Sequence, residues 1–472
     1  MITKTDLRSY LEAPLHLWAA KRGRLEALAP SPFEQHLMEQ GNHIETVAKE
    51  FIAAEAAKRY TNYDLFWQLM YTDGAFQARS DAVIFDRDAG VYDIYEVKSA
   101  TSVKKEHEYD LAFQALVCAA SLPIRDFYLV HVNKEYTRQG EFDPRELFVI
   151  HAINAEIAGR RIEVEQLRSE ALRISQLETP DGIEGCVNPD KCVCPSLCHP
   201  ELPEYPIYDL NRIGVKALAL KQQGILAIQD IPVDYPLSDS QWRQVQVVKQ
   251  GKPWIDQKSI QSELDKLVYP LYFLDYETFN PAVPLFDGYR PYDHIVFQYS
   301  LYVIGRPGGQ FKHHECLLIG PHDPGKELVE NLAHEIGPRG SVIVWYKLFE
   351  AGRNKELARR YTEYSDFLLD LNARMYDLME IFSHGYYLHP DFRGRASLKK
   401  VLPVVVPEMR YEELEISSAE ELMMAWWNLF GGQFAAGERD KLREDMLRYC
   451  EFDTLAMVKI WEKLEKLTHE GI

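Results

Sequence analysis

The stretch Leu271–Phe279, LYFLDYETF, constrains the fold more than any other part of the chain. It is an apolar strand that ends in two carboxylates, Asp275 and Glu277. Side chains alternate across a strand, so these two acids, which are two residues apart, lie on the same face. Two like charges can share a buried face only if something neutralises them, and a divalent cation does this well. We therefore expect this strand to supply the first two ligands of a metal site.

The rest of the C-terminal region predicts two more carboxylates near this pair. Alternating segments on either side of a Pro-Gly-Gly turn at 307–309 predict an antiparallel meander, and residues 341–349 predict another buried strand, which is followed by Glu350. Near the end of the chain, apolar residues at 442, 446, 450, 457 and 460 mark the inner face of a helix. Tyr449 and Asp453 are four residues apart and share one side of it. Because a lone acid on an apolar stripe is costly unless it is paired or binds metal, we expect Asp453 to join the site.

This set of residues resembles the DnaQ-like DEDD exonucleases, in the variant that carries a Tyr-x3-Asp motif. The resemblance implies an RNase H-like α/β domain over residues 266–472 and two bound Mg²⁺ or Mn²⁺ ions. It also implies that Tyr449 positions the attacking water, and that 3′→5′ hydrolysis releases nucleoside monophosphates. Two departures stand out: Glu350 occupies a position where Asp is common, and Lys347 is close enough to compete with metal. The residues in question are Asp275, Glu277, Glu350, Asp453 and Tyr449.

A second acidic pattern lies upstream, on two predicted strands at residues 77–86 and 90–100. The Asp-Ala-Gly turn at 88–90 joins these strands into a hairpin. Asp81 lies on the first strand, and Glu96 and Lys98 share one face of the second. Two carboxylates can hold Mg²⁺, while the lysine orients water or stabilises developing charge. An exposed ion pair is the plainer interpretation of Glu96 and Lys98 alone.

The order of four motifs in this region resembles the RecB-like branch of the PD-(D/E)XK nuclease superfamily. The resemblance covers roughly residues 10–200 and implies a restriction-endonuclease-like domain at 1–200. It implies that Glu45 and Gln114 complete the site with the hairpin residues. The motifs are GNHIE with Glu45, ARSD with Asp81, YEVKS with Glu96 and Lys98, and DLAFQALV with Gln114.

Four of the chain's seven cysteines fall in residues 186–198, CVNPDKCVCPSLC. Four thiols in so short a loop indicate a site for a soft metal. Some RecB-like nucleases hold a [4Fe–4S] cluster here, with a further ligand from a Cys-Pro near the N-terminus. The matching place is Ala13-Pro14, so that ligand is absent and Cys194 would replace it. A [4Fe–4S] cluster, Zn²⁺ and a set of free thiols all stay open. The cysteines are Cys186, Cys192, Cys194 and Cys198.

The distribution of charged residues indicates that contact with nucleic acid would be made by a local basic cluster and not by the whole surface. The net charge of −19 argues against a basic coat along the whole protein. A local cluster of basic residues around DFRGRASLKK is the best candidate for binding phosphates, with a solvated helix face as the alternative. This cluster consists of Arg393, Arg395, Lys399 and Lys400. Residues 201–265 are predicted to be a helical connector.

Other sequence features limit where in the cell the protein is expected and which class of function it has. We find no run of about 18 apolar residues and no apolar signal-peptide core, so we expect a cytoplasmic protein with no membrane partner. The two halves together resemble a family of uncharacterised bacterial proteins that fuses a RecB-like nuclease to a DnaQ-like domain. The leading hypothesis is a metal-dependent nuclease with two sites that hydrolyses phosphodiester bonds in DNA or RNA, with DNA the favoured partner. The alternatives are a non-catalytic nucleic-acid-binding or assembly protein and a small-nucleotide phosphodiesterase.

Overall fold

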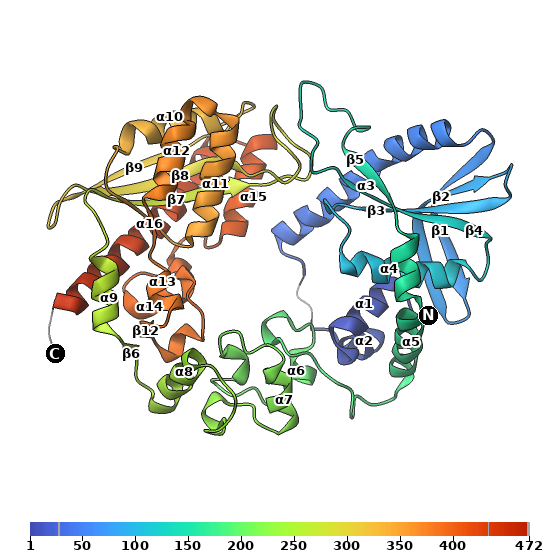
Figure 1. Ribbon diagram of the computed structural model, residues 1–472, viewed down its shortest axis with the longest axis horizontal. Coiled ribbons are helices and arrows are strands. Elements are labelled where there is room, and N and C mark those ends of the chain that lie inside the picture. Colours follow the sequence, from blue (N-terminus) through green and yellow to red (C-terminus); the bar gives the residue numbers. More distant parts are fainter. Residues whose placement is uncertain (27–28, 433, 470–472) are drawn as a thin grey trace. The chain divides into compact units, whose positions relative to one another are not determined.

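The computed structural model describes residues 1–26, 29–432 and 434–469, and the chain divides into two compact units. Unit 1 comprises Met1–Glu201 with Pro281–Asp293, and unit 2 comprises Leu202–Asn280 with His294–Ile472. Within the described residues each unit combines helices with a five-stranded sheet, which confirms the predicted α/β class (Figure 1). Most of the segment predicted as a connector groups with unit 2.

Unit 1 is built on a sheet of order β1-β2-β3-β4-β5, in which β3 and β4 run parallel and the other neighbours run antiparallel. Its helices and strands, with short 3-10 turns written η, are α1 (Lys4–Glu12), α2 (Pro14–Lys21), α3 (Pro32–Arg59), β1 (Tyr63–Asp73), β2 (Phe76–Asp86), β3 (Val91–Lys98), α4 (Lys105–Cys118), β4 (Ile124–Val132), β5 (Phe148–Ala152), α5 (Asn154–Gln176), η1 (Pro189–Lys191) and α6 (Pro195–Cys198).

Local chemistry explains where several of these elements begin and end. Ser31 caps α3 in a capping box with Glu34, and Pro32 supplies a first residue whose missing N–H costs nothing there. The turn between β2 and β3 closes because Gly90 takes a positive φ of 70° and Asp86 accepts backbone N–H groups. The hairpin that was predicted from the 88–90 turn is therefore present.

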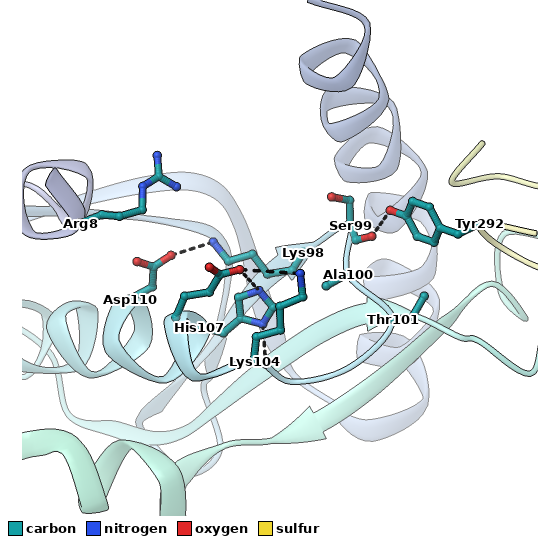
Figure 2. A pocket seen from close by; sticks show the side chains of 10 residues that line it. Arg8, Lys98, Ser99, Ala100, Thr101, Lys104, His107, Asp110 and Tyr292 are labelled. Carbon is teal, nitrogen blue, oxygen red and sulfur yellow. Dashed lines mark hydrogen bonds and ion pairs between the residues drawn. The ribbon is translucent and has the colours of Figure 1, made fainter. Parts of the chain in front are cut away.

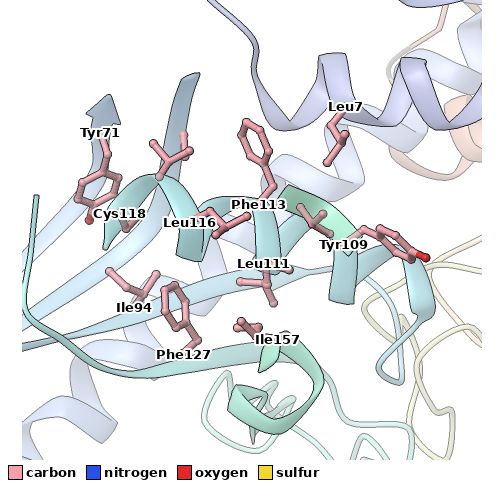
Figure 3. Close-up of a cluster of buried hydrophobic side chains, with 14 of the residues drawn as sticks. Leu7, Tyr71, Ile94, Tyr109, Leu111, Phe113, Leu116, Cys118, Phe127 and Ile157 are labelled. Carbon is pink, nitrogen blue, oxygen red and sulfur yellow. The ribbon is translucent and has the colours of Figure 1, made fainter. Parts of the chain in front are cut away.

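Both faces of the sheet in unit 1 are covered by apolar side chains. On one face, Phe113 of α4 packs with Ile94 and Phe127 of the strands (Figure 3). On the other face, Phe51 of α3 packs with Ile84. Each such fully buried side chain contributes about 2 kcal/mol through removal of its apolar area from water. The sheet is thus a rigid layer on which the candidate site residues are mounted.

Unit 2 is built on a sheet of order β11-β10-β7-β8-β9, in which β10 and β11 run parallel to β7 and the meander β7-β8-β9 is antiparallel. Its elements are η2 (Ile207–Asp209), α7 (Lys216–Gln222), η3 (Ile228–Asp230), α8 (Asp239–Gln250), β6 (Trp254–Ile255), α9 (Gln257–Leu264), β7 (Leu271–Phe279), β8 (Ile295–Ile304), β9 (Phe311–Leu317), α10 (Gly325–Glu335), β10 (Ser341–Val344), α11 (Lys347–Arg360), η4 (Thr362–Tyr364), α12 (Ser365–Ala373), β11 (Met375–Asp377), α13 (Glu380–Ser383), β12 (Tyr387–Leu388), η5 (Pro390–Phe392), α14 (Leu398–Val405), η6 (Tyr411–Glu413), α15 (Ala419–Gly431) and α16 (Ala436–His469).

The strand β7 lies at the centre of this sheet and is covered on both faces. Leu274 and Tyr276 belong to a buried cluster that includes apolar residues of α10, α11 and α12. On the opposite face Phe273 packs against Trp461 of α16, with ring centroids 5.8 Å apart. Odd-numbered residues of β7 therefore point toward α16, which is the face that Asp275 shares.

The prediction of a strand over residues 341–349 is wrong in its second half. β10 ends at Val344, and α11 begins at Lys347. Tyr346 turns the chain with a positive φ of 75°. Asp377 of β11 then accepts the backbone N–H groups of Tyr346 and Lys347 at 3.0 and 2.8 Å, which caps the new helix. Glu350 consequently lies in the first turn of α11 and not beyond a strand end.

No helix within the described parts of the chain combines the length and the apolar character needed to cross a bilayer.

Candidate functional site

In unit 2 the strand β7 and the helix α16 bring acidic groups together. Ligand atoms of Asp275, Glu277 and Cys450 all lie within 4.8 Å of one another. Sγ of Cys450 is 3.7 Å from Oδ2 of Asp275. The two acids therefore face the same helix, as their two-residue spacing predicts. The neighbouring Cys450, which was predicted to lie on the inner face of its helix, is fully buried.

The electrostatics of this site show that four carboxylates interact. Burial raises the pKa of Asp275 well above its ordinary value, and the charge of Asp453 adds to the effect. Burial followed by the charge of Asp275 does the same to Glu277 and to Glu350. Burial also raises the pKa of Asp453, to about 6. The predicted convergence of these acids from β7, α11 and α16 is thus seen in their mutual effects.

One carboxylate oxygen of this cluster lacks a hydrogen bond within the described part of the chain. Oε2 of Glu350 is buried and has no hydrogen-bond partner among the described residues. A buried carboxylate oxygen without a partner is costly, and a hard divalent cation would satisfy it together with the neighbouring charges. The all-oxygen carboxylate set suits Mg²⁺ or Mn²⁺, so the residues present fit the implied ions.

Two buried tyrosines flank Asp453. Tyr449, four residues earlier on α16, donates a hydrogen bond that helps to hold down the pKa of Asp453, which burial raises. Tyr411 of η6 donates a short hydrogen bond to Oδ1 of Asp453. The ring centroids of the two tyrosines are 6.2 Å apart. Sequence reasoning missed Tyr411, because nothing in its local sequence relates it to a helix some 40 residues later.

The expected competition between Lys347 and a metal ion is not what the structure shows. Nζ of Lys347 donates to the backbone oxygen of Met375 at 2.7 Å. The lysine that acts on the acids is Lys399, whose charge lowers the pKa values of Glu277 and Asp453 against the larger effect of burial.

The four residues that were predicted to bind phosphate have different neighbours in the structure. Arg393 donates to Asp209 at 3.3 Å and stacks on a tyrosine ring. The charge of Lys400 also acts on Asp209. Lys399 lies beside the acidic site, whereas Arg395 lines a cavity of about 730 Å³ within unit 2. Of the four, Lys399 is the one placed next to the candidate catalytic groups.

In unit 1 the β2–β3 hairpin brings its predicted residues together. Oδ2 of Asp81 accepts the backbone N–H of Val97 at 2.8 Å. Oε1 of Glu96 accepts from Nζ of Lys98 at 3.0 Å, and its Oε2 accepts from Nε2 of Gln114 at 2.7 Å. Glu96 is only 1% exposed. The order of motifs in the sequence thus corresponds to a compact group in space.

The two carboxylates of this group have opposite pKa shifts. Burial raises the pKa of Asp81 to about 6, and the charge of Glu96 adds to this effect. Burial alone would raise the pKa of Glu96, but Lys98 and Lys4 outweigh it and hold the value at about 2. Lys4, from α1, makes a short ion pair with Oε1 of Glu96. This second lysine was not predicted, because α1 is distant in sequence and carries no related motif.

Glu45 reaches the site through a residue that sequence reasoning also missed. Nε2 of Gln68 lies 2.5 Å from Oε1 of Glu45 and 3.2 Å from Oδ1 of Asp81. The strands β1 and β2 pair on both sides of Gln68 but not at it, and its φ is 53°. Gln68 therefore lies opposite Asp81 with a left-handed backbone conformation, and its amide is directed between two carboxylates.

A cavity of about 480 Å³ opens beside Lys98. Nζ of Lys98 donates to Asp110 at 3.1 Å, and the cavity wall also carries Arg8 and Lys104 (Figure 2). Tyr292 lies on its rim and donates to the backbone oxygen of Ser99. The cavity is therefore a place where positive side chains could contact a phosphate group next to the candidate site.

Three of the four predicted cysteines lie in a compact group with a histidine that was not predicted. His16 of α2, together with three cysteines, forms a group whose ligand atoms all lie within 4.8 Å of one another. The fourth cysteine, Cys194, lies outside this group, with its Sγ 3.6 Å from that of Cys198. Ala13 offers no ligating atom, as predicted, and the side chain from this region that joins the group is His16, one helical turn later. The three cysteines are Cys186, Cys192 and Cys198.

Comparison with known proteins places the acidic site of unit 2 in a shared segment. Residues 272–397 match a family described as a domain of unknown function (DUF2779). This segment includes Asp275, Glu277 and Glu350 and ends before α16, which carries Asp453.

Relatives among the curated proteins are uncharacterized proteins of Ureaplasma and Mycoplasma species. One from Ureaplasma parvum is 28% identical over 219 residues, which is 42% of this chain and 32% of the relative. One from Mycoplasma pneumoniae is 28% identical over 236 residues, covering 44% and 35%. One from Mycoplasma genitalium is 23% identical over 214 residues, covering 42% and 32%. The chain therefore spans about a third of the length of the curated relatives it matches.

Proposed function

We propose that this protein is a metal-dependent nuclease and that unit 2 acts as a 3′–5′ exonuclease of the DnaQ-like type. The observation that carries the proposal is the convergence of four carboxylates from β7, α11 and α16: Asp275 and Glu277 lie within one small group, Oε2 of Glu350 is buried without a hydrogen-bond partner among the described residues, and Asp453 acts on Asp275 and Glu277 through its charge. The mixed sheet, with an antiparallel meander followed by parallel strands, is in keeping with an RNase H-like layer.

The residues of unit 2 suggest a division of roles. The four acids would hold two divalent ions. When bound, such ions lower the pKa of water and stabilise charge on the leaving oxygen. Tyr449 would orient the attacking water, while Tyr411 would fix the carboxylate of Asp453 through its hydrogen bond. Lys399, whose charge acts on Glu277 and Asp453, would contact the phosphate that enters between them.

Unit 1 supports a second site of the PD-(D/E)XK type. Asp81 and Glu96 would hold one cation, and Lys98 would stabilise charge that develops on the phosphate. Gln114 and Glu45 orient this group through the contacts described above. The basic side chains around the neighbouring cavity favour an anionic polymer such as DNA.

Degradation of end-labelled oligonucleotides with Mg²⁺ or Mn²⁺ tests the proposal. Asp275→Asn and Asp453→Asn should abolish release of mononucleotides, whereas Glu96→Ala should remove a different set of products. Asp440→Asn, an exposed aspartate of the same helix as Asp453, is the matched control and should keep both activities.

Three outcomes would contradict the proposal. Products that are identical in all variants would exclude both sites. Binding of DNA without cleavage at saturating Mn²⁺ would favour a non-catalytic scaffold. Turnover of dinucleotides alone would favour a small-nucleotide phosphodiesterase.

A further inference from the structure

The group of His16 and three cysteines is built from two distant parts of unit 1. His16 lies in α2, and the cysteines lie between residues 186 and 198. Nε2 of His16 is 3.5 Å from Sγ of Cys192. The backbone fixes this approach, because Leu15 N–H donates to Glu184 at 3.1 Å. The histidine is therefore held against the cysteine loop by main-chain contacts and not by its side chain alone.

The burial of His16 needs an explanation. The residue is 3% exposed, and its Nδ1 has no hydrogen-bond partner among the described residues. Nδ1 lies 3.7 Å from Oε2 of Glu12, which is beyond hydrogen-bond distance, and Nε2 is aimed at a thiol. A buried imidazole without a full hydrogen bond at Nδ1 is unfavourable in the absence of a ligand. A metal ion bound through Nε2 would account for the position of the ring, and Nδ1–H would then face the carboxylate of Glu12.

Distances separate a single ion from an iron–sulfur cluster. Around one tetrahedral Zn²⁺ with bonds of about 2.3 Å to sulfur, ligand atoms lie about 3.8 Å apart. Around a cubane, each thiolate binds a different iron, and the sulfur atoms lie roughly 6 Å apart. The four ligand atoms here all lie within 4.8 Å of one another. The available space therefore matches a single ion.

Cys194 does not belong to the group of four mutually close ligand atoms. Cys194 is fully buried in an apolar cluster with Trp18 and Ala19. Its Sγ lies 3.6 Å from Sγ of Cys198, where its thiol can donate a hydrogen bond to a metal-bound thiolate. Gly185 is equally close-packed, since a Cβ there would meet Cys198 Sγ at 3.1 Å.

We propose that His16, Cys186, Cys192 and Cys198 bind a single Zn²⁺ ion in tetrahedral geometry. Such a closed site has no open position for a substrate, so its role is structural. It would tie α2 to the C-terminal end of unit 1. This proposal is independent of the nuclease activity, because none of the four ligands belongs to either acidic site.

Metal analysis of the full-length protein, purified without oxygen, tests this assignment. We expect about one zinc per chain and neither iron nor sulfide in stoichiometric amounts. X-ray absorption at the zinc edge should show three sulfur neighbours at about 2.3 Å and one nitrogen at about 2.0 Å. About four irons with sulfide per chain, four sulfur neighbours, or no bound metal would each overturn the proposal.

Variants test the identity of the fourth ligand. His16→Ala should weaken zinc binding by about 100-fold, measured by competition with a chromophoric chelator, since loss of one ligand typically costs several kcal/mol. Cys194→Ser should retain about one zinc per chain. His43→Ala, an exposed histidine of α3, is the control and should bind zinc like the parent. Loss of zinc from Cys194→Ser with retention in His16→Ala would overturn the assignment.

Discussion

Replacing Asp453 with asparagine is expected to stabilise the metal-free protein and to destabilise the metal-loaded protein relative to the parent. In both the metal-free and the metal-loaded protein, the reason is the negative charge of the Asp453 carboxylate. In the absence of metal the ionised carboxylate of Asp453 is buried beside other acids. In the presence of metal the same carboxylate binds the cation, which neutralises its charge. The change keeps an oxygen that can accept the hydrogen bond from Tyr411.

The size of the effect follows from the pKa of Asp453, which is about 6 in the fold against an ordinary value of 3.8. A raised pKa means that the folded state binds the proton more tightly than the unfolded chain. The contribution to stability is therefore complete below pH 3.8 and is lost as the pH rises through 6. Above that pH the ionised group costs about 3 kcal/mol, because each pKa unit corresponds to about 1.4 kcal/mol.

Urea unfolding followed by tryptophan fluorescence provides the assay, since Trp426 is fully buried in unit 2. In EDTA at about pH 7.5, Asp453→Asn should exceed the parent by up to about 3 kcal/mol, and this gain should disappear near pH 4. Mn²⁺ at about 1,000 times its dissociation constant should add about 4.1 kcal/mol to the parent and little to the variant. The order of stabilities should then reverse.

The control is Asp440→Asn, which should follow the parent in every condition because its side chain is exposed. A variant at Asp453 that is less stable than the parent in EDTA at all pH values would refute the electrostatic argument. Equal stabilisation of parent and variant by Mn²⁺ would refute the role of Asp453 as a ligand.

Three other substitutions probe the two sites. Tyr449→Phe should slow mononucleotide release by roughly 10² to 10⁴, and an unchanged steady-state rate would exclude its role. Lys4→Met removes a charge that holds the pKa of Glu96 at about 2. Stability from a depressed pKa is present at neutral pH and lost in acid, so acid unfolding, followed by circular dichroism, should begin at higher pH. Gln68→Ala removes the donor shared with Asp81 and should shift the pH–rate profile of unit 1 upward; an identical profile contradicts this.

Features set by short-range periodicity could be predicted from the sequence. The two-residue spacing of Asp275 and Glu277 required a common face, whichever sheet the strand joined. The same argument placed Glu96 and Lys98, and the turn at 88–90 placed Asp81 opposite them. These inferences depend on backbone geometry alone, so tertiary structure did not alter them.

Features set by distant contacts could not be predicted. His16 and Lys4 are ordinary residues of amphipathic helices, and only the packing of those helices brings them to a site. The end of β10 is a similar case, because residues 341–349 are apolar enough for either a strand or a helix. The choice depends on Asp377, which accepts two backbone N–H groups at the start of α11.

The division of the chain has a consequence for biosynthesis. Unit 1 includes Pro281–Asp293, which follow β7 in the chain, and Tyr292 of this segment donates to Ser99 next to Lys98. A ribosome that adds 5 to 20 residues per second needs about 5 to 20 s to translate the roughly 90 residues from 201 to 293. Residues 1–201 of the nascent chain therefore cannot complete unit 1 until residues 281–293 have been synthesised, and by then part of unit 2 has also been synthesised.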